Sequence, residues 1–172
     1  MASATARTGV TEFSIASDTQ VKFVRVVNAP KHLVFEAYTK PEHLKNWLSG
    51  FEGWTMPICE MEPRAGGKWR YGWRSAEGAE MTMGGIVKEY VPNERISTTE
   101  RWGDEMAPHE GGSQWPETVN TVTFAEANGL TTITTTVTYP SKDARDEAIK
   151  TGMRDGLDVS YARLDSLLAS LS

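Results

Sequence analysis

The feature that most constrains this fold is a long run of alternating residues followed by one helical segment. From residue 55 to residue 139, apolar and polar side chains alternate with the period of two that β-strands produce. The segment Lys68–Arg74 shows this most clearly, because Trp69, Tyr71 and Trp73 share one face. Short turn motifs such as Asn128-Gly129 interrupt the run. We therefore expect six consecutive strands joined as an antiparallel meander.

After Pro140 the spacing of apolar residues becomes helical. A helix from Ser141 to Ser170 would be about 40 Å long. Its second half carries one apolar stripe, made of Leu157, Tyr161, Leu164, Leu168 and Leu171. An antiparallel meander has one polar and one apolar face, and this helix is the only expected element long enough to cover the apolar face.

The N-terminal part adds one strand and two short helices. Residues 1–16 are small and polar, so we expect a flexible leader there, followed by one domain over residues 17–172. Val21–Val27 is rich in β-branched residues and predicts the first strand. Two short amphipathic segments follow it, one around Leu33 and one around Trp47. The predicted class is thus α+β: a curved antiparallel sheet around a long C-terminal helix, with two short helices after the first strand.

Composition argues against several classes of function. The net charge is −5 and no run of Lys or Arg occurs, which argues against a nucleic-acid partner. One cysteine, Cys59, and three scattered histidines give neither a disulfide nor metal-ligand spacing, so we expect no metal and no cofactor. No segment has the length of a signal peptide core or of a membrane span of about 20 apolar residues. We expect a cytoplasmic protein.

Aromatic residues dominate the expected inner face of the sheet. Such rings can fill a core against the last helix, or they can form the wall of a small-molecule pocket. Buried Trp and Tyr each need a partner for their polar atom, which favours a partly hydrated pocket. The candidate pocket residues from the sheet and the last helix are Trp69, Tyr71, Trp73, Trp102, Asn120, Phe124, Ile149, Met153 and Gly156.

Glycines interrupt two of the expected elements. Gly152 and Gly156 each cost about 1 kcal/mol relative to alanine inside a helix. They could leave room for a ligand, allow close approach of a strand, or mark a break of the helix near Gly152. Inside the strand expected over residues 80–90, Gly84-Gly85 predicts a bulge or a sharp bend.

Glu100 and Tyr71 are the candidates for a catalytic role. Strand parity places Glu100 on the same face as Trp102, and Asn120 on the same face as Phe124. A buried glutamate among aromatic rings would have a raised pKa and could act as a general acid or base. The alternative is an exposed Glu100 that pairs with an arginine of a neighbouring strand. No complete catalytic constellation is present, so the sequence does not establish an enzyme.

The order and spacing of several motifs resemble the START-like (SRPBCC) superfamily. Within it, the chain is similar to the branch named after homologues of the heat-shock-protein-90 ATPase activator. The motifs that carry the resemblance are Val21–Arg25 with Ala29-Pro30, Thr39–Leu44 with Trp47, Gly85–Glu89, Pro92–Ile96, Ala144–Asp146, Gly152-Met153 and Gly156 with Tyr161–Leu164. The resemblance covers roughly residues 20–170. It implies a helix-grip fold with a cavity for apolar molecules, and no fixed chemistry.

Three hypotheses of function follow. In the first, the chain binds a hydrophobic or aromatic small molecule between the sheet and the last helix, with the loop 103–114 near the mouth. In the second, a polyketide cyclase-like or hydrolase-like enzyme uses the same pocket, with Glu100, Tyr71 or Asn120 as polar groups. In the third, the chain is a chaperone-associated cofactor. The chain could also form a homodimer. The sequence does not identify the ligand.

Overall fold

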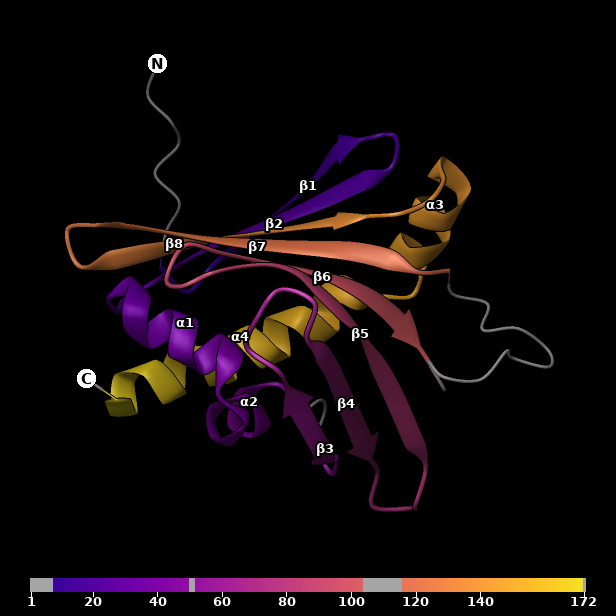
Figure 1. The fold of residues 1–172 in the computed structure, drawn as a ribbon, viewed down its shortest axis with the longest axis horizontal. Coiled ribbons are helices and arrows are strands. Elements are labelled where there is room, and N and C mark those ends of the chain that lie inside the picture. The colour runs from indigo at the N-terminus through magenta and orange to yellow at the C-terminus, as the bar shows by residue number, and fades with distance from the viewer. Residues whose placement is uncertain (1–7, 50–51, 104–115, 172) are drawn as a thin grey trace.

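The computed structural model describes residues 8–49, 52–103 and 116–171 of the chain. These residues form one eight-stranded antiparallel sheet and four helices, of which the last is the longest (Figure 1). The predicted α+β class with a curved sheet and a long C-terminal helix is confirmed. Among the described helices, none is long and apolar enough to cross a membrane.

The strands follow each other in the sheet in the order β1-β2-β8-β7-β6-β5-β4-β3. Six of them, β3 to β8, are the predicted meander, and the N-terminal strands extend it beside β8. At the turn between β7 and β8, Asn128 and Gly129 have φ angles of 54° and 78°, as a tight hairpin requires. The bounds of the strands are β1 Thr11–Ser17, β2 Gln20–Val27, β3 Thr55–Met61, β4 Lys68–Arg74, β5 Glu80–Val91, β6 Arg95–Trp102, β7 Thr118–Ala127 and β8 Leu130–Thr138.

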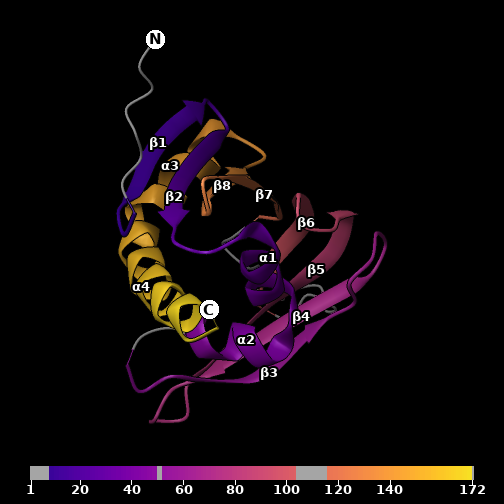
Figure 2. The same cartoon turned by 90° about the vertical axis from the view of Figure 1, so that its left-hand side faces the viewer.

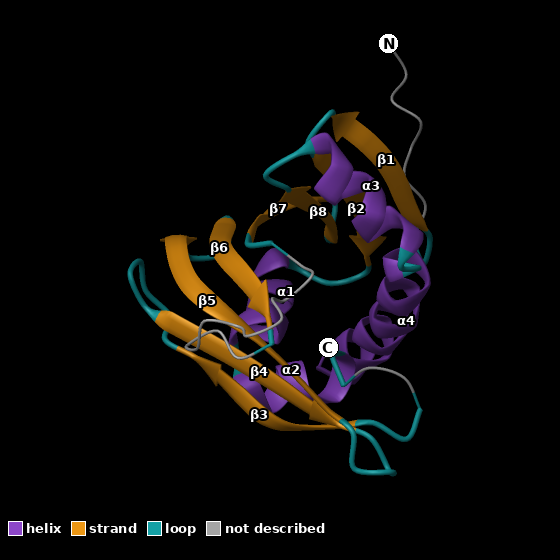
Figure 3. Cartoon of the chain, turned by 90° about the vertical axis from the view of Figure 1, so that its right-hand side faces the viewer, coloured by secondary structure: helices purple, strands orange, loops and turns teal. Residues whose placement is uncertain are grey.

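The helices lie on the concave side of this sheet. They are α1 Lys31–Thr39, α2 Pro41–Trp47, α3 Lys142–Lys150 and α4 Met153–Leu171. Figure 2 shows α1 and α2 inside the curve of the sheet, and Figure 3 shows α4 across its open side. The inward stripe of α4, Tyr161, Leu164 and Leu168, is at most 2% exposed and belongs to the main core.

The predicted leader over residues 1–16 is wrong for its second half. Residues 11–17 form β1, which pairs along β2, while residues 1–7 lie outside the described part of the chain. Thr11 is buried because its hydroxyl accepts a hydrogen bond of 2.7 Å from Arg25, and Phe13 packs against Phe23 with ring centroids 5.2 Å apart. The two short helices therefore follow the second strand, not the first.

The single helix expected from Ser141 to Ser170 is two helices. Ser141 caps α3, because its side chain accepts a 3.1 Å hydrogen bond from the backbone of Ala144. The chain then turns at Gly152, whose φ of 77° is the left-handed conformation that ends helices. Of the alternatives considered for Gly152, the helix break is the one observed.

Candidate functional site

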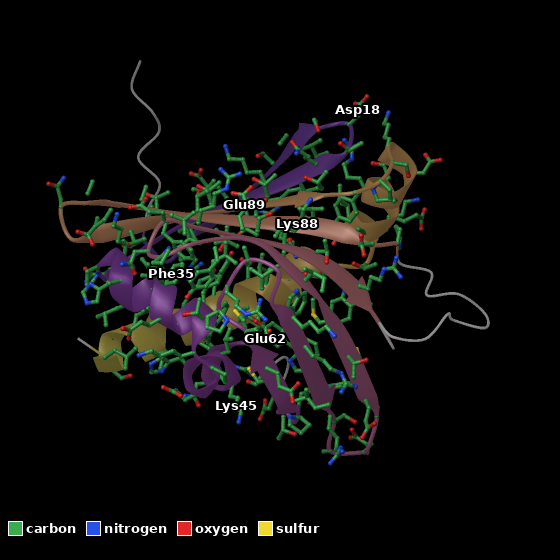
Figure 4. The ribbon with its side chains drawn as sticks, viewed as in Figure 1. Asp18, Phe35, Lys45, Glu62, Lys88 and Glu89 are labelled. Atoms are coloured by element: carbon green, nitrogen blue, oxygen red, sulfur yellow. The ribbon has the colours of Figure 1, made fainter. Side chains whose placement is uncertain are left out.

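The register of the central strands fixes which side chains face the helices. Phe124 on β7 is buried and meets Phe35 of α1 edge to face, with centroids 5.5 Å apart, and Figure 4 marks Phe35 between α1 and the sheet. Val122 and Asn120 share the face of Phe124, and β7 pairs with β6 and β8 without a register shift. Asn120 lies opposite Thr98 on β6, so the predicted parity of Glu100 and Asn120 is confirmed.

Several of these inward side chains are not fully covered. Four of them, Thr98, Asn120, Val122 and Thr135, are half-buried, although inward neighbours such as Ile96 and Ile133 are buried. Their strands, β6, β7 and β8, have a neighbouring strand on both sides, so the accessible surface does not belong to a sheet edge. The concave face is therefore packed less completely here than around Ile96, Phe124 and Ile133.

Glu100 and Asn120 form the polar pair of this region. The side-chain amide of Asn120 donates a hydrogen bond to the carboxylate of Glu100, and both residues are half-buried. Burial raises the pKa of Glu100 to about 7, and the hydrogen bond from Asn120 acts in the opposite direction. Among the described residues, the partner of Glu100 is thus an amide, and not the arginine of the alternative considered from the sequence.

Two tyrosine hydroxyls respond to the charge of Glu100. Burial raises the pKa of Tyr71 well above its usual range, and the charges of Cys59 and Glu100 raise it further. Burial likewise raises the pKa of Tyr139 to about 12, again with a contribution from Glu100. Glu100 is therefore the acid of a small buried group in which the tyrosines stay protonated.

An aromatic wall flanks this group on one side. Trp69, Tyr71 and Trp73 are buried on one face of β4, and their centroids are 4.8 Å and 6.2 Å apart in succession. Trp102 continues the row, stacks on Trp73 at 5.8 Å, and is 36% exposed. The indole nitrogens of Trp69 and Trp73 donate to the backbone oxygens of Thr99 and Leu48, so their polar atoms are already satisfied.

The other predicted pocket residues lie at different depths. Phe124 is part of a ring cluster with Phe35 and Tyr38. Ile149 packs against a separate core cluster formed around β2, β8 and α3. Gly156 is half-buried in the first part of α4, and the side chain of Met153 lies outside the described residues, as does the loop 104–115.

A second polar group in the interior was missed from the sequence. The hydroxyl of Tyr161 on α4 lies 3.4 Å from the hydroxyl of Thr135 on β8. The buried hydroxyl of Tyr38 has no hydrogen-bond partner among the described residues, and burial together with the neighbouring Tyr161 raises its pKa well above the usual value. The signal was available, because Thr135 interrupts the apolar inward series Ile133, Val137 and Tyr139.

Other features of the surface offer no competing site. Within the described ranges, no three His, Cys, Asp or Glu side chains gather closely enough to hold a metal ion. A shallow depression lies at the surface between α2 and α4, lined by Asn46, Ala162, Arg163, Ser166 and Leu167. It shares none of the residues of the two polar groups.

Comparison with known proteins places the chain among others of this fold. Residues 28–169 match the family described as Activator of Hsp90 ATPase homolog 1-like protein. A protein from Rhodobacter sphaeroides is 28% identical, with a TM-score of 0.83 over 94% of this chain and 99% of that chain. Protein Ms6760 from Mycobacterium smegmatis is 22% identical, with a TM-score of 0.80 over 92% and 96%.

A third solved structure carries the name of the family. The AHSA1 protein from Silicibacter pomeroyi is 18% identical, with a TM-score of 0.69 over 89% of this chain and 99% of that chain. Identities below 25% show a common fold alone. Among curated protein sequences, none matches the chain significantly.

Proposed function

The chain belongs to the family of Activator of Hsp90 ATPase homolog 1-like proteins, and on that premise we propose that it binds a small hydrophobic or aromatic molecule on the concave side of its sheet. At the level of the family, this fold supports a ligand-binding type of domain. The observation that carries the proposal for this chain is the incomplete burial of inward side chains on three central strands. A native core packs such positions closely unless a ligand or water takes the space.

The chemistry of the lining favours a mostly apolar ligand with polar handles. Tyr71, Met83 and Trp102 share the inward face of β4, β5 and β6, and Val122 and Leu157 lie on β7 and α4. Glu100 and Asn120 supply the polar atoms among them. A carboxyl group with a pKa of about 7 can donate or accept a hydrogen bond near neutral pH, so this pair can orient a ligand oxygen.

Native mass spectrometry of the purified chain tests the proposal. We expect a stoichiometric apolar compound, which denaturation releases for identification, or an empty chain that takes up added 2-naphthol at a ratio of one to one. An empty chain that also fails to bind 2-naphthol would contradict the proposal, because a pocket of this lining should accept a small aromatic probe.

A second candidate is an enzyme that uses the same pocket. The observation in its favour is the raised pKa of Glu100 beside Tyr71 and Tyr139, since a general acid or base works best with a pKa near the working pH. Incubation of the released compound with the wild type and with Glu100→Gln separates the two functions. An enzyme converts the compound, and its Glu100→Gln variant loses turnover and keeps binding. A binding protein converts nothing in either form.

The remaining hypotheses have fewer observations in their support. The chaperone-associated role has the wording of the family description behind it, and stimulation of an Hsp90 ATPase by the purified chain would test it. The homodimer and the cytoplasmic location stay predictions.

A further inference from the structure

The two polar groups of the interior belong to the same concave face. The outer group is Glu100 with Asn120, and the inner group is the hydroxyls of Tyr38, Tyr161 and Thr135. They come from different elements: β6 and β7 supply the outer group, and α1, α4 and β8 supply the inner group.

Strand pairing gives the spacing of the two groups. Thr135 lies directly opposite Val122 on β7, and Asn120 lies two residues further along the same strand. Two residues of a strand span about 7 Å. Thr135 therefore lies beside Val122, one inward row away from Asn120, and Asn120, Val122 and Thr135 are all half-buried. The two groups are thus about that distance apart along the strands, with the apolar side chain of Val122 beside them.

The inner group has hydrogen-bonding capacity left over. A buried hydroxyl without a partner is unfavourable, so native structures rarely leave one unpaired without a ligand or water. The hydroxyl of Tyr38 makes no hydrogen bond of good geometry, although the hydroxyl of Tyr161 lies near enough to affect its pKa, and the contact between Tyr161 and Thr135 at 3.4 Å is long for two hydroxyls. Arg25 lies beside these hydroxyls: its guanidinium pairs with Asp165 and lies over the ring of Tyr161, and its Nε makes no hydrogen bond among the described residues.

We propose that the ligand is an aromatic compound with an oxygen at each end, one bound by Glu100 and Asn120 and the other by the hydroxyls of Tyr38, Tyr161 and Thr135. The inference rests on the proposed binding function and narrows the class of ligand. The apolar body lies over Val122, and each end replaces water at a polar group. A ligand with one oxygen satisfies one group and leaves the other to water.

Isothermal titration calorimetry with 2-naphthol and 2,6-dihydroxynaphthalene tests this inference on the full chain. The two probes differ by one hydroxyl at the far end of the same ring system. One hydrogen bond is worth about 1 kcal/mol, so we expect the dihydroxy compound to bind about fivefold more tightly. In Tyr38→Phe its Kd should rise to that of 2-naphthol, whereas 2-naphthol, which can use the outer group, should bind as before.

Two further variants make the result specific. Thr135→Val removes another hydroxyl of the inner group and should have the same effect, and it replaces Tyr38→Phe if that variant does not fold. Tyr90→Phe is the matched control. Tyr90 on β5 packs against Phe35 of α1 and is separated from Val122 by Ile96, so it should change neither Kd.

The outcomes separate the inference from the function beneath it. Equal affinity for both probes, or an advantage that persists in Tyr38→Phe and Thr135→Val, would overturn the two-ended ligand while leaving the pocket intact. Failure of both probes to bind would overturn the proposed function and the inference together.

Discussion

The indole nitrogen of Trp69 on β4 donates a 2.9 Å hydrogen bond to the backbone oxygen of Thr99 on β6, although β5 lies between these strands. The link crosses β5 at Gly85, which is the residue directly opposite Trp69. At the same place, the side-chain oxygen of Thr99 accepts from the backbone nitrogen of Ile86. Three strands are thus tied together where the middle one has no side chain.

Gly85→Ala should destabilise the protein strongly. A Cβ at Gly85 would lie 2.0 Å from the oxygen of Thr99, so the backbone of β6 has to move and the bond to Trp69 is lost. Overpacking and one lost hydrogen bond together cost about 3 kcal/mol in free energy of unfolding. Urea denaturation followed by circular dichroism measures this loss.

Gly129→Ala is the control for this substitution. Gly129 also disfavours a side chain because its φ is 78°, but nothing lies within 4 Å of its added Cβ. We expect a loss of about 1 kcal/mol there. If both variants lose the same amount, the close approach at Thr99 does not determine the cost at Gly85.

Asp165→Ala tests the ion pair that joins α4 to the sheet. Arg25 has a side chain that is only 5% exposed, and it pairs with Asp165 at 2.5 Å. Removing the carboxylate leaves a buried positive charge without its counterion, which destabilises a protein. Because Asp165 is 35% exposed, we expect a smaller loss than for a fully buried pair, about 2 kcal/mol in free energy of unfolding. Thermal unfolding measures it. Asp158→Ala, an exposed position on the same helix, should change stability little, and equal effects of both would show that the pair contributes nothing specific.

The sequence predicted the meander and its inward face well, for identifiable reasons. Tight turns such as Asn128-Gly129 mark strand ends locally, and the inward parity of Glu100 and Asn120 followed from simple alternation because β6 and β7 pair without a shift. The break at Gly152 was one of the alternatives, since glycine permits both a close contact and a left-handed turn, and only its φ of 77° decides between them.

What the sequence could not provide are features that depend on tertiary contacts. The strand β1 carries few apolar residues, and the side chain that buries Thr11 is Arg25, on another strand. The expected bulge at Gly84-Gly85 is displaced, because the register shift falls between Val87 and Glu89 while Gly85 makes room for Trp69. The hydroxyls of Tyr38 and Tyr161 come together only because α1 and α4 meet inside the sheet.

The stability of the protein should fall as pH rises from about 4.5 to about 7 on account of Glu100. Its pKa rises on folding from 4.5 to about 7, so the folded state holds a proton that the unfolded state has lost. The protonated carboxyl costs nothing below pH 4.5, and the penalty grows between that pH and about 7. At about 1.4 kcal/mol per pH unit, the penalty above neutrality is at most about 3 kcal/mol.

Glu100→Gln isolates this effect because glutamine keeps the shape and still accepts a hydrogen bond from Asn120. We expect the variant to gain stability relative to the wild type when the pH of a urea denaturation series is raised from 5 to 8. A difference between the two proteins that stays constant over this range would show that Glu100 does not titrate in it.

Gly156→Leu should weaken ligand binding without harm to the fold. Gly156 is half-buried near Leu157 at the start of α4, and its φ is not among the positive values, so a leucine fits the backbone and favours the helix by about 0.5–1 kcal/mol. Its side chain would occupy space on the concave side that we assign to the ligand. We expect the Kd of 2-naphthol to rise at least tenfold in calorimetry while the melting temperature holds or increases. Ala162→Leu, at an exposed position of the same helix, should leave the Kd unchanged. Unaltered binding by Gly156→Leu would place the ligand away from the first turns of α4.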